Sequence, residues 1–441
     1  MSTSRFNNIH LGLSQQEAIR ILSLPLEQLE SKSDYYMAAS HLINFPGESS
    51  ENALLKLLES KVSEQEILLA QRKAIEVLAR LGSYISIPTI GTYLDSSDPY
   101  LVENAAWALG QLQCTDKILN NKIVELLNKP YCNRRVLIQA IALLNLKNAA
   151  PEIELLQNDE NPGVKGAAIS AVSQLNETDE RVMELADHLL LPNQMDRQSA
   201  IQDAVDCKAL ILLPDILRSP VSPVFRMRAF RALWPKDTCK VEGLDLVDCL
   251  DMLLKDDISA LTLVHEYDAP PTDEFLIQEL FGTDFSRCYL ALNTLSVRPA
   301  QDFLPLLLSR WSDDAHNDYG AHYFFMRLFG MYQNWPESSL PEIKAILLDA
   351  ISNERPQFMK SKAAATWSLG FVCPSICGDL LLKILSPDCE AFWEVRYAAL
   401  MLVEKLYLQI NPERFRFTEL VKNDPEPFVR FKATQIINDK I

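Results

Sequence analysis

Glycine is scarce in this sequence, with 13 residues in 441. The sequence also contains no GxxxxGK[ST] loop, no GxGxxG or GxSxG fingerprint and no HExxH pair. The glycine-rich loops bring backbone amides against phosphates, and the histidine pair holds zinc. Their absence argues against a nucleotide-binding enzyme, so we expect neither a nucleotide nor a metal cofactor.

Long apolar runs are missing as well, and no stretch is long enough to span a bilayer. The first eight residues, MSTSRFNN, lack the apolar core of a signal peptide. We therefore expect a soluble cytoplasmic protein without a membrane partner. The net charge is −17, and an acidic surface repels phosphate backbones, so nucleic acid is not an expected partner either.

The nine cysteines are an odd number and are scattered along the chain. The shortest spacing, between Cys373 and Cys377, is CxxxC, and no CxxC or HxxxH pattern indicates zinc. We expect most of the cysteines to be reduced thiols in the core. Cys132 differs from the others because Arg134 and Arg135 follow it, and nearby positive charge favours a thiolate.

Apolar residues at helical spacing are abundant from Ser33 onward, and signals for strands are almost absent. Similar segments recur, each opening on a proline, asparagine or acidic residue: Asp98–Ala106, Asn161–Ala168, Pro223–Ala229, Glu394–Ala398 and Pro427–Ala433. Val102 and Val164 lie 62 residues apart, which is two units of 31. This period is typical of HEAT-like helix pairs, which bury their apolar faces only against neighbouring pairs. The predicted fold is all-α, a curved α/α solenoid of such repeats.

Irregular spacing in the middle of the chain divides the predicted solenoid into two halves. Trp107-Ala-Leu-Gly returns as Trp367-Ser-Leu-Gly, which predicts equivalent places for the two tryptophans in their repeats. The predicted parts are an N-terminal lead (residues 1–32), a first half (33–236), an irregular junction (237–284) and a second half (285–441).

The densest group of proton donors and acceptors lies between His316 and Arg327. In a helix, Asp318 and His322 would share a face, and Tyr319 and Tyr323 would form a neighbouring stripe. Packing alone has little use for so many ionisable groups, so a functional site is the favoured interpretation. The alternative is a polar helix start that precedes a core run and binds nothing.

Arginines and tryptophans form the other notable groups in this acidic chain. Arginine forks pair well with carboxylates, but in HEAT-like units a basic residue after the turn also ties neighbouring units together. Tryptophans serve core packing, and they would also suit a flat conjugated ligand. The residues concerned are Arg134, Arg135, Arg226, Arg228, Arg231, Trp107, Trp234, Trp311, Trp367 and Trp393.

The stretch from Tyr100 to Gly110, with its Glu103-Asn104…Trp107-Ala-Leu-Gly motif, resembles the HEAT-repeat phycobilin lyases of cyanobacteria, of the E/F type. The stretch from His316 to Gly330 is similar to the longer, single-chain members that act on phycoerythrin. The resemblance implies a lyase that attaches phycoerythrobilin to a cysteine of a phycoerythrin alpha subunit. Some members also isomerise the bilin to phycourobilin. The Asn-His-Cys-Gln-Gly-Asn motif of one isomerising branch is absent, so its residues are not carried over.

The resemblance implies roles for the residues named above. Asp318 would accept hydrogen bonds from the pyrrole N–H groups, with Tyr319, His316 and His322 as acid and base groups. The ligand-binding set would be Glu103, Asn104, Trp107, Arg134, Arg226, Arg228, Tyr323, Trp367 and, as a transient carrier, Cys132. The alternatives are a lyase without isomerase activity, a bilin carrier, and a HEAT-repeat adaptor that binds other proteins without catalysis.

Overall fold

The computed structural model describes residues 12–60, 64–236, 238–241, 243–332, 334–406 and 414–438. Over these ranges the regular structure is helical except for one antiparallel hairpin, in which β1 (Lys240–Val241) pairs with β2 (Leu244–Asp245). The predicted all-α class is confirmed. The chain forms two compact units, Met1–Leu185 and Ala186–Ile441. Their boundary falls inside the predicted first half, and the predicted junction belongs to the second unit.

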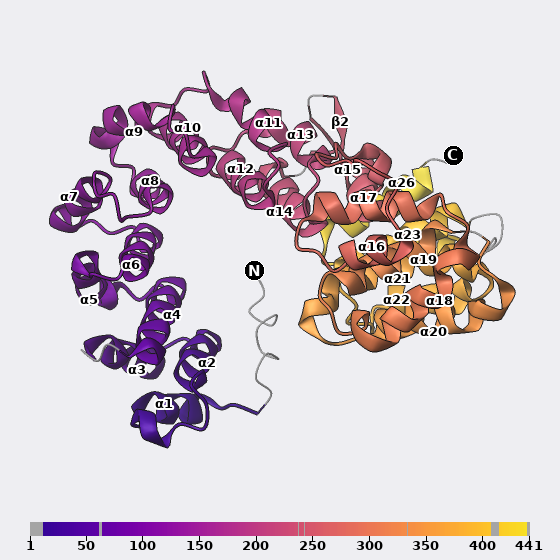
Figure 1. The fold of residues 1–441 in the computed structure, drawn as a ribbon, viewed down its shortest axis with the longest axis horizontal. Coiled ribbons are helices and arrows are strands. Elements are labelled where there is room, and N and C mark those ends of the chain that lie inside the picture. The colour runs from indigo at the N-terminus through magenta and orange to yellow at the C-terminus, as the bar shows by residue number, and fades with distance from the viewer. Residues whose placement is uncertain are drawn as a thin grey trace. The chain divides into compact units, whose positions relative to one another are not determined.

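Unit 1 consists of two rows of helices, which Figure 1 shows side by side. One row contains α3, α5, α7 and α9. The other row contains α4, α6, α8 and α10, and in it each helix packs on the next. The helices are α1 (Gln15–Ser23), α2 (Asp34–His41), α3 (Glu48–Glu59), α4 (Gln65–Leu81), α5 (Ile87–Thr92), α6 (Pro99–Gln111), α7 (Lys117–Leu126), α8 (Arg134–Leu143), α9 (Ala150–Leu156) and α10 (Pro162–Asn176).

The predicted repeat openings are helix N-termini. Asp98 accepts a hydrogen bond from the amide of Tyr100 at 2.9 Å, and Pro99 begins α6. Asn161 accepts from the amide of Gly163 at 2.9 Å, and the following proline begins α10. A polar N-cap satisfies an amide that has no partner within the helix, and proline suits the first helical position. The local sequence therefore sets where each of these helices starts.

Small residues let consecutive helices of the repeat series approach closely. A Cβ atom on Gly110 would lie 3.3 Å from the Cα of Ala140 in α8, and one on Gly370 would lie 2.2 Å from Leu402 Cδ2. Trp107 and Trp367 each stand three residues before such a glycine, on α6 and on α21 (Met359–Val372). The two tryptophans therefore occupy equivalent positions in their repeats, as the sequence predicts.

Unit 2 continues the pairing of helices, with α17, α19, α21, α23 and α26 packed one on the next. Apart from α21, the α-helices that follow α10 are α11 (Leu185–His188), α12 (Gln194–Asp206), α13 (Leu213–Arg218), α14 (Pro223–Leu233), α15 (Leu246–Lys255), α16 (Asp273–Glu279), α17 (Phe285–Ser296), α18 (Ala300–Arg310), α19 (Ala321–Met331), α20 (Leu340–Ser352), α22 (Cys377–Leu385), α23 (Trp393–Lys405), α25 (Arg414–Leu420) and α26 (Pro427–Asn438).

Contacts between distant parts of the sequence close unit 2 on itself, because α15 packs on α21, α23 and α26. Lys432 of α26 is buried and donates to Asp251 of α15 at 3.0 Å and to Glu404 of α23 at 2.7 Å. Tyr397 of α23 donates to the same aspartate at 3.0 Å. These contacts hold the C-terminal end of α15 beside α19 and α21, where the candidate site lies.

Candidate functional site

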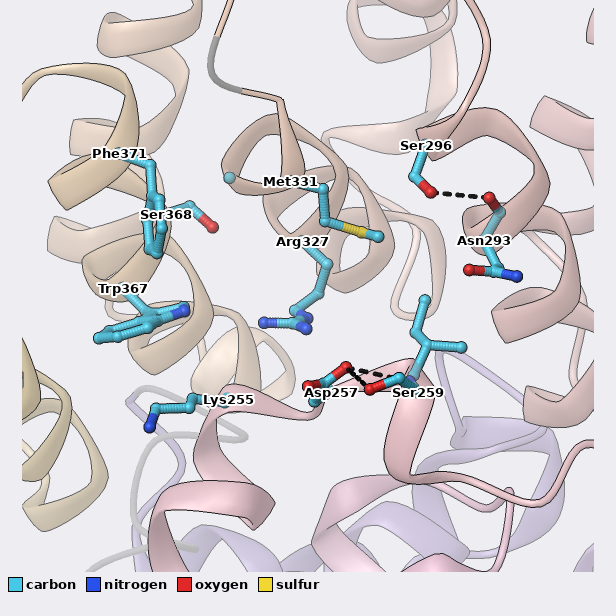
Figure 2. Close-up of a pocket in the computed structure, with 12 residues that line it drawn as sticks. Lys255, Asp257, Ser259, Asn293, Ser296, Arg327, Met331, Trp367, Ser368 and Phe371 are labelled. Carbon is cyan, nitrogen blue, oxygen red and sulfur yellow. Dashed lines mark hydrogen bonds between the residues drawn. The ribbon is translucent and has the colours of Figure 1, made fainter.

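A cavity of about 390 Å³ lies in unit 2 between the end of α15 and helices α17, α19 and α21. Figure 2 shows aromatic side chains of α21 on one wall, polar side chains of α17 on the opposite wall and Arg327 of α19 between them. The lining residues are Lys255, Asp257, Ile258, Ser259, Asn293, Ser296, Arg327, Gly330, Met331, Trp367, Ser368 and Phe371.

Arg327 occupies the repeat position at which α6 and α21 carry tryptophan, three residues before a glycine. Its side chain is 6% exposed, and its Nη2 donates to the backbone carbonyl of Asp256 at 2.8 Å. Its Nε atom is buried and has no hydrogen-bond partner among the described residues. A buried guanidinium with a spare donor is a strong binding group for a carboxylate.

The aromatic wall carries cations as well. Lys255 Nζ lies 5.8 Å from the ring centroid of Trp367. Lys405 Nζ lies 5.7 Å from the same ring and 4.0 Å from the ring of Phe371. Ammonium groups over aromatic faces are held by the ring quadrupole. This wall can therefore stack against a flat conjugated molecule while its cations bind acidic groups at the edge of that molecule.

The pocket also holds an accessible carboxylate. Asp257 is exposed, and its Oδ1 accepts hydrogen bonds from the amide of Ser259 at 3.0 Å and from its hydroxyl at 2.8 Å. These two bonds fix the orientation of the side chain. An ionised carboxylate is a pure acceptor, so Asp257 is suited to N–H groups of a ligand.

Behind the pocket, Asp256 is completely buried in a cluster of donors. Its carboxylate accepts from Tyr289 at 2.8 Å, from Tyr323 at 2.5 Å and from Arg226. Burial opposes ionisation, but the guanidinium groups of Arg226 and Arg327 hold the pKa of Asp256 below its usual value. Burial and the neighbouring carboxylate raise the pKa values of both phenols well above 10. The carboxylate is therefore ionised and the tyrosines are neutral donors.

Two predicted ligand-binding residues belong to this buried cluster, which corrects the sequence-based prediction for both. Arg226 is 1% exposed and is bound to Asp256, so its guanidinium does not face a ligand. Tyr323 is 3% exposed, and its hydroxyl faces the same carboxylate. By contrast, Arg228 is exposed and donates to Gln202 at 3.0 Å. Trp367 is the predicted ligand-binding residue that lines the pocket.

The predicted acid and base residues lie at the other end of α19. The helix begins at Ala321, after Asp318, so that Asp318 and His322 do not share a helical face as predicted. Asp318 Oδ1 instead accepts the amides of Gly320 at 2.8 Å and Ala321 at 2.7 Å. Arg327 lies eight residues after Tyr319, which corresponds to about 12 Å along a helix axis. The predicted acid and base residues therefore lie apart from the pocket.

The other groups at this end of α19 differ in accessibility. Tyr319 is 52% exposed, and burial of its ring raises the pKa of its phenol above the usual 10. His322 stacks on Phe358 with ring centroids 4.3 Å apart. Burial, followed by the charge of Arg355, lowers the pKa of His322 to about 4, so its ring is neutral at pH 7. His316 is exposed, with Nδ1 at 3.1 Å from the carbonyl oxygen of Trp311.

Sequence reasoning missed Lys360, whose ammonium group lies against the ring of Tyr319. Lys360 Nζ lies 3.8 Å from the ring centroid of Tyr319 and is buried without a hydrogen-bond partner among the described residues. Burial lowers its pKa to about 8. Asp256, Asp257, Lys255 and Phe371 were also missed as site residues. The Arg327-Leu-Phe-Gly string, aligned on the two Trp-x-Leu-Gly strings, is the signal that could have located the pocket.

The remaining predicted residues lie in unit 1. Trp107 is partly buried, with Arg80 at 5.9 Å from its ring centroid, and Asn104 donates to the carbonyl of Tyr100 at 2.7 Å. Arg134 donates to the carbonyl of Leu127 at 3.3 Å and pairs with Asp159 at 3.4 Å.

The expectation of a thiolate at Cys132 is wrong. Its side chain is buried, and burial together with the carboxylate of Glu103 raises the pKa of the thiol. Burial likewise raises the pKa of Glu103 itself. None of the nine cysteines, which all lie in the described ranges, forms a disulfide bond.

Two further properties of the described part of the chain concern metal sites and membrane-spanning helices. No cluster of three His, Cys, Asp or Glu side chains there could hold a metal ion. No single helix in the described ranges is long and apolar enough to cross a membrane. One pair of segments, Pro356–Val372 and Pro374–Leu385, meets the length and composition criteria only when joined across a bend of 112°.

Comparison with known proteins identifies the family, although no family model matches. The solved complex of CpcE and CpcF of phycocyanin lyase from Nostoc sp. PCC7120 is 21% identical, with a TM-score of 0.47 over 56% of this chain and 95% of that chain. The uncharacterized phycocyanin operon protein Y of Pseudanabaena tenuis (strain PCC 7409) is 35% identical over 427 residues, which is 96% of this chain and 97% of that protein. The bilin biosynthesis protein CpeY of Synechococcus sp. (strain WH8020) is 44% identical over 406 residues, which is 92% of this chain and 97% of that protein. The chain therefore belongs to the family of this bilin biosynthesis protein, the HEAT-type phycobilin lyases.

Proposed function

We propose that this lyase binds phycoerythrobilin in the pocket of unit 2 and attaches it to a cysteine of a phycoerythrin alpha subunit. Membership in the phycobilin lyase family supports bilin attachment, and a curated relative is named for bilin biosynthesis. The observation that carries the assignment to this pocket is the aromatic wall of Trp367 and Phe371 beside the cations Arg327 and Lys255. A bilin is a flat conjugated chain with two propionates, which matches such a lining.

The chemistry of attachment sets what the chain must supply. The acceptor thiol adds to the ethylidene group of ring A, so a carbon–sulfur bond forms and the exocyclic double bond becomes single. The proton of the thiol ends on the bilin, which conserves atoms and electrons. Arg327 and Lys255 would hold the propionates, and Asp257 would accept the pyrrole N–H groups. Such contacts fix one conformer and stabilise positive charge on the conjugated system.

We also propose that four residues just before and at the start of α19 transfer protons, namely His316, Asp318, Tyr319 and His322. Tyr319 is 52% exposed and is a neutral donor at pH 7. Asp318, His316 and His322 are the other proposed acid and base groups, and isomerisation to phycourobilin would require the same group to remove a proton from ring A. The unit 1 residues Glu103, Asn104, Trp107, Arg134 and Cys132, and Arg228 of unit 2, stay predicted ligand contacts.

The decisive experiment mixes the purified protein with phycoerythrobilin and then with apo-phycoerythrin alpha subunit. A visible spectral shift in the first step and a covalent coloured band in the second support the proposal. A shift without the band indicates a carrier, and no shift at all indicates a protein-binding adaptor. The absorption of the product distinguishes attached phycoerythrobilin from phycourobilin, and so tests isomerisation separately.

Two variants test the proton-transfer group in the same assay. Asp318→Asn keeps an oxygen for the two amides at the helix start, so it should cost less than about 1 kcal/mol of stability. Its attachment or isomerisation rate should nevertheless fall by about 10²-fold or more. Tyr319→Phe should retain bilin binding and lose turnover. Normal product at a normal rate from either folded variant would remove that residue from the mechanism.

A further inference from the structure

The conformation of Asp256 links the buried cluster to the pocket. Its φ of 48° and ψ of 49° place it in the left-handed region, directly after the last residue of α15. This conformation costs a residue with a Cβ on the order of 1 kcal/mol, so other contacts must maintain it. It directs the backbone carbonyl to Arg327 and the carboxylate to Arg226, Tyr289 and Tyr323.

Every polar group of Asp256 therefore has a partner. Its amide donates to the carbonyl of Met252 at 2.9 Å, and both carboxylate oxygens accept hydrogen bonds. Arg327, by contrast, has one Nη2 bond to this backbone and a buried Nε without a partner among the described residues. The Nη2 end of the guanidinium is fixed by the cluster, and Arg327 lines the pocket, where its positive charge lies close to a group that enters.

We propose that the buried cluster of Asp256, Arg226, Tyr289 and Tyr323 positions Arg327 to bind a ligand carboxylate. This inference rests on the proposed function and adds four positioning residues that do not touch the ligand. Its physical basis is preorganisation, because an arginine held in its binding orientation loses little conformational freedom when the carboxylate arrives. If the turn at Asp256 loosened, Arg327 would lose its fixed orientation, although every residue proposed to touch the ligand would still be present.

The test compares two probes, phycoerythrobilin and its dimethyl ester, because esterification replaces the ionised carboxylates with neutral esters and keeps the conjugated chain. Tyr323→Phe deletes one hydrogen bond to Asp256 and leaves the ring. We expect its affinity for the diacid to fall by about tenfold and its affinity for the ester to change by less than about twofold. Tyr289→Phe deletes a different hydrogen bond to the same carboxylate and should shift the two affinities in the same way.

Tyr397→Phe is the matched control. Tyr397 is completely buried in α23 and donates to Asp251, so the variant loses an equivalent hydrogen bond to a carboxylate of unit 2. Asp251 also pairs with Lys255 of the pocket at 3.3 Å and with Lys432 at 3.0 Å. Both ion pairs remain in the variant, so the ratio of diacid to ester affinity should change by less than about twofold. Circular dichroism and urea unfolding establish that each variant is folded before titration.

The outcomes separate the two proposals. If the wild type binds neither probe, the proposed function and this inference both fail. If the wild type prefers the diacid, but Tyr323→Phe and Tyr289→Phe keep that preference, the positioning role is wrong and the proposed function stands. Equal losses for diacid and ester would mean that the cluster supports only the fold. If both tyrosine variants are unfolded, so that the cluster serves global stability, the inference is overturned as well.

Discussion

Gly330 provides a stringent test of how the pocket is built. A Cβ atom at this position of α19 would lie 2.2 Å from Ser368 Oγ, 2.6 Å from Ser368 Cβ and 2.7 Å from Ser368 Cα. The last of these is backbone of α21, which no side-chain rotation can move. Gly330→Ala must therefore push α19 and α21 apart, and these helices carry Arg327 and Trp367, which both line the pocket.

The size of the effect follows from three contributions. Overpacking a tight interface costs about 1–3 kcal/mol. Separation also weakens the buried hydrogen bond from Ser368 to the carbonyl of Met326, now 2.7 Å, which is worth about 1 kcal/mol. The higher helix propensity of alanine offsets this by about 0.5–1 kcal/mol. We expect the free energy of unfolding to fall by about 2 kcal/mol and the melting temperature by roughly 4–8 °C.

Urea and thermal unfolding measure this loss, with Gly378→Ala as the control. Gly378 lies in α22, and a Cβ atom there would meet no atom within 4 Å. That variant should gain about 0.5–1 kcal/mol from helix propensity alone. Affinity for phycoerythrobilin should fall in Gly330→Ala and stay constant in Gly378→Ala. Equal stability of the two variants would refute the close packing of α19 on α21.

Two further predictions concern titratable groups. Because the pKa of His322 is lowered to about 4, its neutral ring stabilises the fold above pH 6.5, and about 3 kcal/mol should be lost as the pH falls from 6.5 to 4. Urea unfolding at both pH values should show a correspondingly smaller loss in His322→Gln, and equal losses would contradict the assignment. Burial and a raised pKa should make Cys132 react with iodoacetamide at pH 8 at least about tenfold more slowly than the exposed Cys239. Mass spectrometry of the labelled peptides compares the two, and similar rates would contradict the buried, protonated thiol.

The residues that the sequence placed correctly act over short stretches of chain. Asp98 and Asn161 each accept a hydrogen bond from the amide two residues further along the chain, so the adjacent sequence is enough to predict their capping roles. Trp107 and Trp367 are equivalent because the same four-residue string recurs. Trp367 was also chosen as a ligand-binding residue and lines the pocket, whereas Arg226 was chosen for its charge and is buried.

The amino-acid sequence by itself determined the helical class, the repeat and the starts of helices, because apolar period and capping are properties of local sequence. Only the tertiary structure decided the pocket and the cluster behind it. Asp256 meets Arg226 across 30 positions, Tyr289 across 33 and Tyr323 across 67. Pairings over such separations depend on how helices stack and how α15 packs back on the C-terminal helices. Packing then decides what each buried arginine contacts: Arg226 forms an internal ion pair with Asp256, whereas Arg327 lines the pocket and is proposed to bind a ligand carboxylate.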